Sequence, residues 1–115
     1  MTTEDVISLV RRQLNDDHAG SGVRWSNAVL TKYINCAQHE LMDRRQDILL
    51  KSDGTLATVA NVTSLADVLS DGLTEEWKSA LSSYVLYLCF SEDDADTVNP
   101  RKAERHLRDF EERLE

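Results

Sequence analysis

The cysteine and histidine residues of this chain are candidates for metal binding. Cys36 and His39 stand three positions apart, a spacing that places both side chains on one face of a helix, where they could share a metal ion. A closed zinc site needs about four ligands, and the remaining candidates, Cys89, His18 and His106, are scattered along the sequence. We therefore expect no metal site, with the cysteines acting as small apolar side chains.

Catalytic motifs are not recognisable in the sequence. There is no phosphate-binding glycine loop, no nucleophile elbow and no set of nucleophile and base. The pair His39-Glu40 lacks the second histidine of a zinc-protease motif. We expect a protein that is not an enzyme and that binds no cofactor. A small metal-binding or hydrolytic enzyme stays as an alternative, because a cysteine or serine can lie beside a histidine that is distant in sequence.

Acidic residues gather between Glu92 and Asp96. The segment has no glycine, so it does not fit a calcium-binding loop. Negative charge at the end of a helix opposes the helix dipole at a cost of about 0.3–1 kcal/mol per exposed charge, although the same acids also precede the positive end of the next predicted helix. Two interpretations stay open: a solvated corner, and a channel or partner surface formed by Asp93, Asp94 and Asp96.

Arg24 and Trp25 are the second candidate surface. Both residue types are enriched where a few side chains dominate a protein interface. In the other interpretation, Trp25 packs as the residue before a helix N-cap at Ser26, in the manner of a hydrophobic staple.

Charge is unevenly distributed along the chain. The net charge of the 115 residues is −8, and the whole excess lies in residues 47–98, where Lys51 and Lys78 stand against ten acidic side chains. A surface that grips nucleic acid needs clustered lysine and arginine. The pattern instead fits a surface that repels DNA or meets a basic partner.

Apolar periodicity predicts four helices, at about residues 4–14, 27–45, 74–90 and from 99 onward. Their expected caps are Thr2 or Thr3, Ser26, Thr74, and Asn99 followed by Pro100. The side of the second helix opposite its apolar stripe, together with the flanks, is expected to hold Lys32, Asn35, Gln38, His39 and Asp43. The predicted apolar stripes are Val6, Leu9, Val10 and Leu14; Leu30, Ile34, Ala37 and Leu41; Trp77, Leu81, Tyr84, Val85, Leu88 and Cys89; and Ala103, Leu107, Phe110 and Leu114.

The connection over residues 46–73 is harder to interpret. Asp53-Gly54 is a turn signal, and the Thr- and Val-rich stretch 55–63 is compatible with a short strand or hairpin. Ser64 to Asp67 has the outline of a capping box and is compatible with one helical turn. We therefore predict an all-α fold, a small four-helix bundle whose irregular 46–73 connection holds a short hairpin or a helical turn.

Length and composition favour one domain over residues 1–115. The longest apolar run, from Tyr84 to Phe90, is far too short to span a membrane. Two cysteines are too few for a disulfide framework, and acidic residues near the N-terminus do not fit a secretion signal. We expect an intracellular setting with reduced thiols.

Two blocks of residues resemble the head-to-tail adaptor family of tailed bacteriophages, also called head completion or connector proteins. Together they span most of the chain, and their order and spacing support the resemblance more than any single motif does. One departure is Glu92-Asp93, where the family tends to have a basic and an acidic residue. The first block is Asp16-Asp17, Val23-Arg24-Trp25-Ser26, Leu30, Tyr33-Ile34-Asn35 and Ala37-Gln38; the second is Val62-Thr63-Ser64-Leu65, Trp77, Ala80-Leu81, Tyr84-Val85-Leu86-Tyr87, Ser91-Glu92-Asp93, Asn99, Ala103 and Phe110.

The resemblance implies a structural virion protein without catalysis or cofactor. Such a protein forms a ring, usually of twelve subunits, below the portal protein in the virion neck after assembly in the host cytoplasm. It extends the DNA channel, lets DNA pass without specific binding, and docks tail or stopper proteins. A ring requires two different patches to meet, and the polar sides of the second and fourth helices are the candidates.

A bacterial regulatory or protein-interaction domain is the main alternative. The 4-3-4 spacing of Ala103, Leu107, Phe110 and Leu114 could form a coiled-coil seam, so that two chains would dimerise through the C-terminal helix.

Overall fold

The computed structural model describes residues 1–17, 27–50, 54–55, 59, 61–69, 73–91 and 99–114. Within these ranges the chain forms four α-helices and two short 3-10 helices, and no β-strand. The predicted all-α bundle is therefore confirmed. The elements are α1 (Thr3–Asp17), α2 (Asn27–Arg44), η1 (Gln46–Leu49), η2 (Glu75–Trp77), α3 (Lys78–Ser91) and α4 (Asn99–Arg113).

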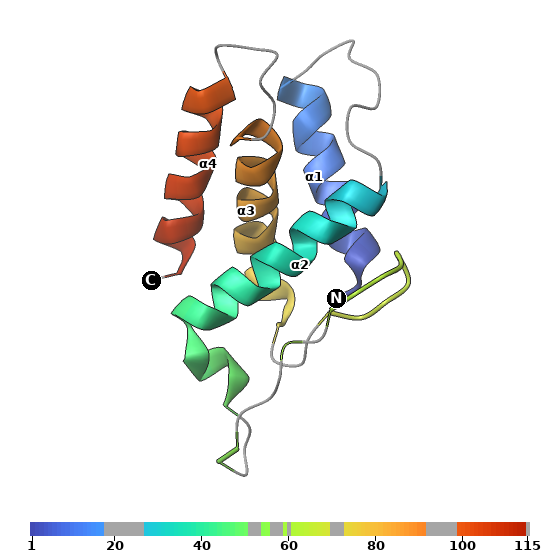
Figure 1. The fold of residues 1–115 in the computed structure, drawn as a ribbon, viewed down its shortest axis with the longest axis vertical. Coiled ribbons are helices and arrows are strands. Elements are labelled where there is room, and N and C mark those ends of the chain that lie inside the picture. Colours follow the sequence, from blue (N-terminus) through green and yellow to red (C-terminus); the bar gives the residue numbers. More distant parts are fainter. Residues whose placement is uncertain are drawn as a thin grey trace.

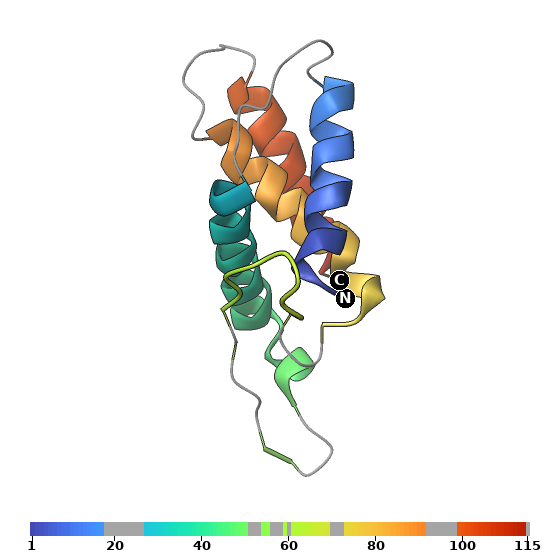
Figure 2. The same ribbon diagram turned by 90° about the vertical axis from the view of Figure 1, so that its right-hand side faces the viewer.

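The helix α3 lies at the centre of the bundle (Figure 1). Helices α1 and α4 flank it on opposite sides, and α2 crosses the bundle obliquely (Figures 1 and 2). All three other α-helices contact α3, whereas α4 packs along α3 without close backbone contact to α1 or α2. The central position predicted for this apolar helix is thus confirmed, and α4 is an edge helix.

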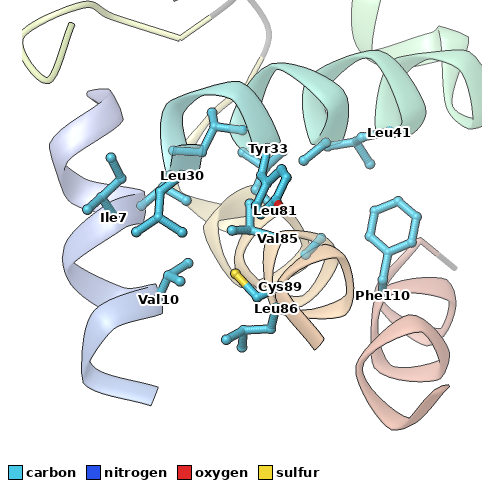
Figure 3. Close-up of a cluster of buried hydrophobic side chains, with 14 of the residues drawn as sticks. Ile7, Val10, Leu30, Tyr33, Leu41, Leu81, Val85, Leu86, Cys89 and Phe110 are labelled. Carbon is cyan, nitrogen blue, oxygen red and sulfur yellow. The ribbon is translucent and has the colours of Figure 1, made fainter. Parts of the chain in front are cut away.

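One apolar core joins the four helices (Figure 3). The predicted stripe of α2 is buried completely, and so are Val6, Val10, Leu81, Val85 and Phe110. Cys89 is part of this core, with no solvent exposure. The fully buried stripe residues of α2 are Leu30, Ile34, Ala37 and Leu41.

The start of α1 is fixed by a capping box. The backbone N–H of Asp5 donates to Thr2 Oγ1 (3.4 Å), and the backbone N–H of Thr2 donates to Asp5 Oδ2 (2.9 Å). These bonds lower the pKa of Asp5 below its ordinary value. Thr2 is therefore the cap, while the hydroxyl of Thr3 donates elsewhere, to the backbone carbonyl of Asp67 (3.0 Å).

The start of the central helix differs from the prediction. Thr74 occupies the N-cap position, but its hydroxyl forms no bond to the helix backbone and donates instead to Glu76 Oε1 (3.1 Å). The chain enters α3 through the 3-10 turn η2. Trp77 ends that turn half-buried, with the Arg45 guanidinium 5.3 Å from its ring centroid. Hydroxyl capping by Thr74 was therefore wrong, because an acidic side chain competes for the same hydroxyl.

The connection 46–73 contains no hairpin among its described residues. Gly54, with φ of 88°, adopts the left-handed conformation expected of a turn glycine. Ser64 to Ala66 form a turn, and the one extended pairing is an isolated antiparallel bridge between Thr2 and Val68. In place of a strand pairing, the described residues 61–69 form hydrogen bonds with the start of α1 and with the side chain of Asn35 in α2.

Candidate functional site

The outward side of α2 carries exposed polar side chains and lines an open hollow. Lys32, His39 and Asp43 are exposed along it, as the sequence predicted, and Cys36 is exposed beside them. Gln38 is an exception, because its side chain is completely buried and its Nε2 donates to Asn35 Oδ1 (3.3 Å). The expectation that Gln38 lies on the polar side or flanks of the helix was therefore wrong, since an internal hydrogen bond allows an amide to enter the core.

Asn35 holds the chain of residues 61–69, which we call the anchored segment, against α2. Its Nδ2 donates to the backbone carbonyl of Val62 (2.9 Å), and its Oδ1 accepts from the Val62 backbone N–H (2.8 Å). One amide side chain thus satisfies both backbone groups of Val62, as a neighbouring strand would. Val62 itself is 3% exposed and belongs to the core.

The other end of the anchored segment is tied to the first residues of the chain. The backbone N–H of Thr3 donates to the Asp67 carbonyl (2.9 Å), that of Glu4 to the Leu65 carbonyl (3.1 Å), and that of Leu69 to the Met1 carbonyl (3.2 Å). The carbonyl groups of Leu65 and Asp67 thereby satisfy N–H groups at the start of α1 that have no partner within the helix.

Asp67 stabilises the turn within the anchored segment. Its Oδ2 accepts from the backbone N–H groups of Thr63 (2.7 Å) and Ser64 (3.1 Å). Because these bonds favour the ionised carboxylate, they lower the pKa of Asp67. The expected capping outline at Ser64 to Asp67 is thus present as a tight turn, with the carboxylate directed back toward the residues that precede it.

An open hollow of about 700 Å³ lies between the outward side of α2, Asn61 of the anchored segment and Tyr84 of α3. At one edge, His39 Nε2 and Asn61 Oδ1 are 2.9 Å apart. At the other edge, burial and the nearby Glu40 raise the pKa of Tyr84. Its lining residues are Lys32, Asn35, Cys36, His39, Glu40, Asp43, Asn61 and Tyr84.

Arg44 connects α2 with α4. Its Nε donates to Glu40 Oε1 (2.7 Å), its Nη1 to Glu111 Oε2 (3.5 Å), and its guanidinium lies 5.6 Å from the Phe110 ring centroid. These two carboxylates raise its pKa, Glu40 having the larger effect. Next to it, Arg45 donates to the Leu114 carbonyl and pairs with Asp47 (2.9 Å). Arg44 and Arg45 therefore connect the C-terminal end of α2 with the C-terminal part of α4.

The fold separates the candidate metal ligands Cys36 and His39 from Cys89 and His106, and His18 lies outside the described residues. Cys36 is exposed beside His39 in the hollow, whereas Cys89 is buried in the core. The apolar role expected of the cysteines is thus confirmed for Cys89 and wrong for Cys36. His106 is 7% exposed and stacks on Phe90, with ring centroids 5.5 Å apart. No three His, Cys, Asp or Glu side chains converge on a metal-sized site among the described residues.

The predicted surface residues Arg24, Trp25, Asp93, Asp94 and Asp96 lie outside the described residues, as does the expected cap Ser26. Their roles stay predictions.

The sequence analysis missed the structural role of Asn35, which binds the backbone of Val62. The available signal was weak, because it consisted of a single amide on the polar side of an amphipathic helix.

Comparison of the chain with protein-family models, with curated proteins and with solved structures found no match. Among the described helices, none combines the length and apolar character needed to cross a membrane.

Proposed function

We propose that this chain is a structural protein of a tailed-bacteriophage neck, an adaptor that forms a ring below the portal and docks tail or stopper proteins. The proposal rests on the two residue blocks together with the fold. The four-helix bundle around α3 is the architecture that the resemblance implies. The proposal assigns the chain no catalytic step and no cofactor, and it places the protein in the virion after assembly in the host cytoplasm.

The residues of the second block are mainly core residues. Ala80, Leu81, Val85 and Phe110 are each 0–1% exposed, and the Tyr84 ring packs at a tilt of 57° against the Phe110 ring, with centroids 4.8 Å apart. This block therefore supports the proposal through the fold, because it specifies how α3 packs against its neighbours. Contacts between subunits must come from other residues, on the surface.

Two surfaces suit the heterologous contact of a ring, in which a patch on one subunit meets a different patch on the next. One is the outward side of α2 with its open hollow, including the exposed Asp43. The other is the outward side of α4, an edge helix whose main packing partner is α3. The two surfaces belong to different helices, so both can be occupied at once.

The acidic excess of residues 47–98 fits passage of DNA through the ring. Negative charge on a channel wall repels phosphate groups, so that DNA would move without being held. Asp93, Asp94 and Asp96 are the residues proposed for that wall, and their position on the outer wall of an assembled ring would contradict this part of the proposal.

The experiment that tests the proposal combines the purified chain with the portal protein encoded in the same genome and images the mixture by electron cryo-microscopy. We expect a ring of this chain against one end of the portal, with the family's usual twelve copies. The charge reversal Asp43→Lys should reduce ring formation, whereas Glu4→Lys, on the exposed start of α1, should not. A chain that ignores the portal under conditions in which the portal is intact would overturn the proposal.

A further inference from the structure

The apolar stripe of α4 packs against the core of its own chain. Ala103, Phe110 and Leu114 are 0–9% exposed, and Leu107 is half-buried against the same core. This stripe is therefore not available as the coiled-coil seam of a dimer. Any contact of α4 with another molecule must use its charged side.

Four exposed residues on that charged side follow one another at intervals of three, four and three positions: Arg101, Glu104, Arg108 and Glu111. The interval is that of the positions along the seam of a coiled coil. The side chains of Glu104, Arg108 and Glu111 are 73%, 67% and 53% exposed, so they are accessible to a second helix.

The sign of the charge alternates along this row, and the alternation selects one orientation of a partner helix. In an antiparallel pair of identical helices centred on residue 106, Arg101 faces Glu111 of the second copy and Glu104 faces its Arg108. Every residue of the row then meets the opposite charge. In a parallel pair in register, every residue would meet its own type, which is repulsive.

We propose that α4 pairs with α4 of a second copy of this chain, antiparallel and related by a two-fold axis, through Arg101, Glu104, Arg108 and Glu111. Two-fold symmetry makes each of the two charge pairs occur twice. The dimer is weak, because exposed ion pairs each contribute little and are screened by salt.

Ion pairs within one chain compete with this contact without preventing it. Glu104 and Arg108 are 3.7 Å apart along the helix, and Arg44 is 3.5 Å from Glu111. Both distances exceed the 2.7–2.9 Å of a tight charge-assisted hydrogen bond. Each of these residues can therefore also accept an opposite charge from a second copy.

The self-pairing goes beyond the proposed ring. Neighbours in a ring are related by rotation about the ring axis, which does not produce the two-fold antiparallel contact. The pair is thus a state of the free chain that opens when α4 is needed for a heterologous contact. Its test uses the isolated chain, so its failure would leave the portal experiment unaffected.

The test is analytical ultracentrifugation of the full chain over a concentration series up to about 1 mM, at about 20 mM and about 500 mM salt. We expect a monomer–dimer equilibrium at low salt that high salt shifts to the monomer. Arg108→Glu and Glu104→Arg should each weaken dimerisation at least about tenfold, because each turns two attractions into repulsions. Arg12→Glu, on the exposed side of α1, changes the charge by the same amount as Arg108→Glu; it is the matched control for that variant and should leave dimerisation unchanged.

Mixing the two single variants separates pairing between chains from effects within one helix. An Arg108→Glu chain and a Glu104→Arg chain are each self-repulsive in this row, but they attract each other at both contacts. The mixture should therefore dimerise within about threefold of the unaltered chain. Absence of dimer at low salt, insensitivity to Arg108→Glu, or failure of the mixture to dimerise would each overturn the proposal.

Discussion

The helices α2 and α4 are both amphipathic, yet they are held in the molecule in different ways. α2 packs on α3 and α1 through its buried stripe, and its polar side also binds the anchored segment through Asn35 and His39. α4 packs along α3, and its charged side is joined to α2 by the Arg44–Glu111 pair. One helix is therefore held from two sides and the other mainly from one.

This difference shows that polar periodicity alone does not tell a solvated surface from a structural one. On α2, the amides of Asn35 and Gln38 are structural, and the charged residues beside them are exposed. On α4, exposed charges form an accessible row. Uncharged amides that can satisfy backbone groups are the residues to suspect of a structural role.

Removing the largest side chain between α4 and the bundle should have the largest effect. Phe110 is fully buried and contacts Tyr84 and Arg44. We expect Phe110→Ala to lower the free energy of unfolding by about 3–5 kcal/mol, measured by urea denaturation. Because α4 is held mainly through α3, hydrogen exchange should accelerate most in α4 and least in α2.

The control for this change is Arg108→Ala, on the exposed side of the same helix, which should alter stability by less than about 0.5 kcal/mol. Equal loss of protection in α2 and α4 after Phe110→Ala would show that the two helices are held alike, and the comparison would fail.

Removing the amide of Asn35 should have an intermediate effect. Asn35→Ala leaves the N–H and carbonyl of Val62 without these partners, and we expect a loss of about 1–3 kcal/mol. Hydrogen exchange should increase in residues 61–69 and at the start of α1, while α4 stays protected. Lys32→Ala, exposed on the same helix, is the control; similar exchange in both variants would contradict the role given to Asn35.

Asp67 should produce the smallest effect, and one that depends on pH. Its pKa is lowered in the folded state, so its contribution to stability is present above the ordinary aspartate pKa and is lost as the pH falls through the folded-state value. We expect Asp67→Asn to be less stable than the unaltered chain near pH 7. The difference should shrink as the pH is lowered below about 4.

Thermal unfolding of both proteins across that pH range measures this difference directly. Asp5 and Asp47 also have lowered pKa values, but they titrate in both proteins and cancel in the comparison. A difference that is constant with pH would show that the carboxylate charge of Asp67 is not what stabilises the turn.

Much of the fold could be predicted because the apolar spacing and the capping residues that specify a helix lie within a short stretch of sequence. The stripe of α2 and the Thr2 cap follow from spacing and capping chemistry within a few residues, and α4 begins at Asn99, close to the predicted start. The candidate site could not be predicted in the same way. His39 and Asn61 are 22 positions apart, and no local pattern indicates that they meet.

The sequence by itself determined the four helices, the buried apolar stripe of α2 and the alternating charges of α4, because these depend on periods of three and four residues along one chain. Only the tertiary structure decided which polar residues are structural. Asn35 pairs with Val62 and Thr3 with Asp67 because α1, α2 and the anchored segment meet in space. Such pairings satisfy backbone groups that a local pattern leaves open, and their partners are fixed only when the core brings distant segments together.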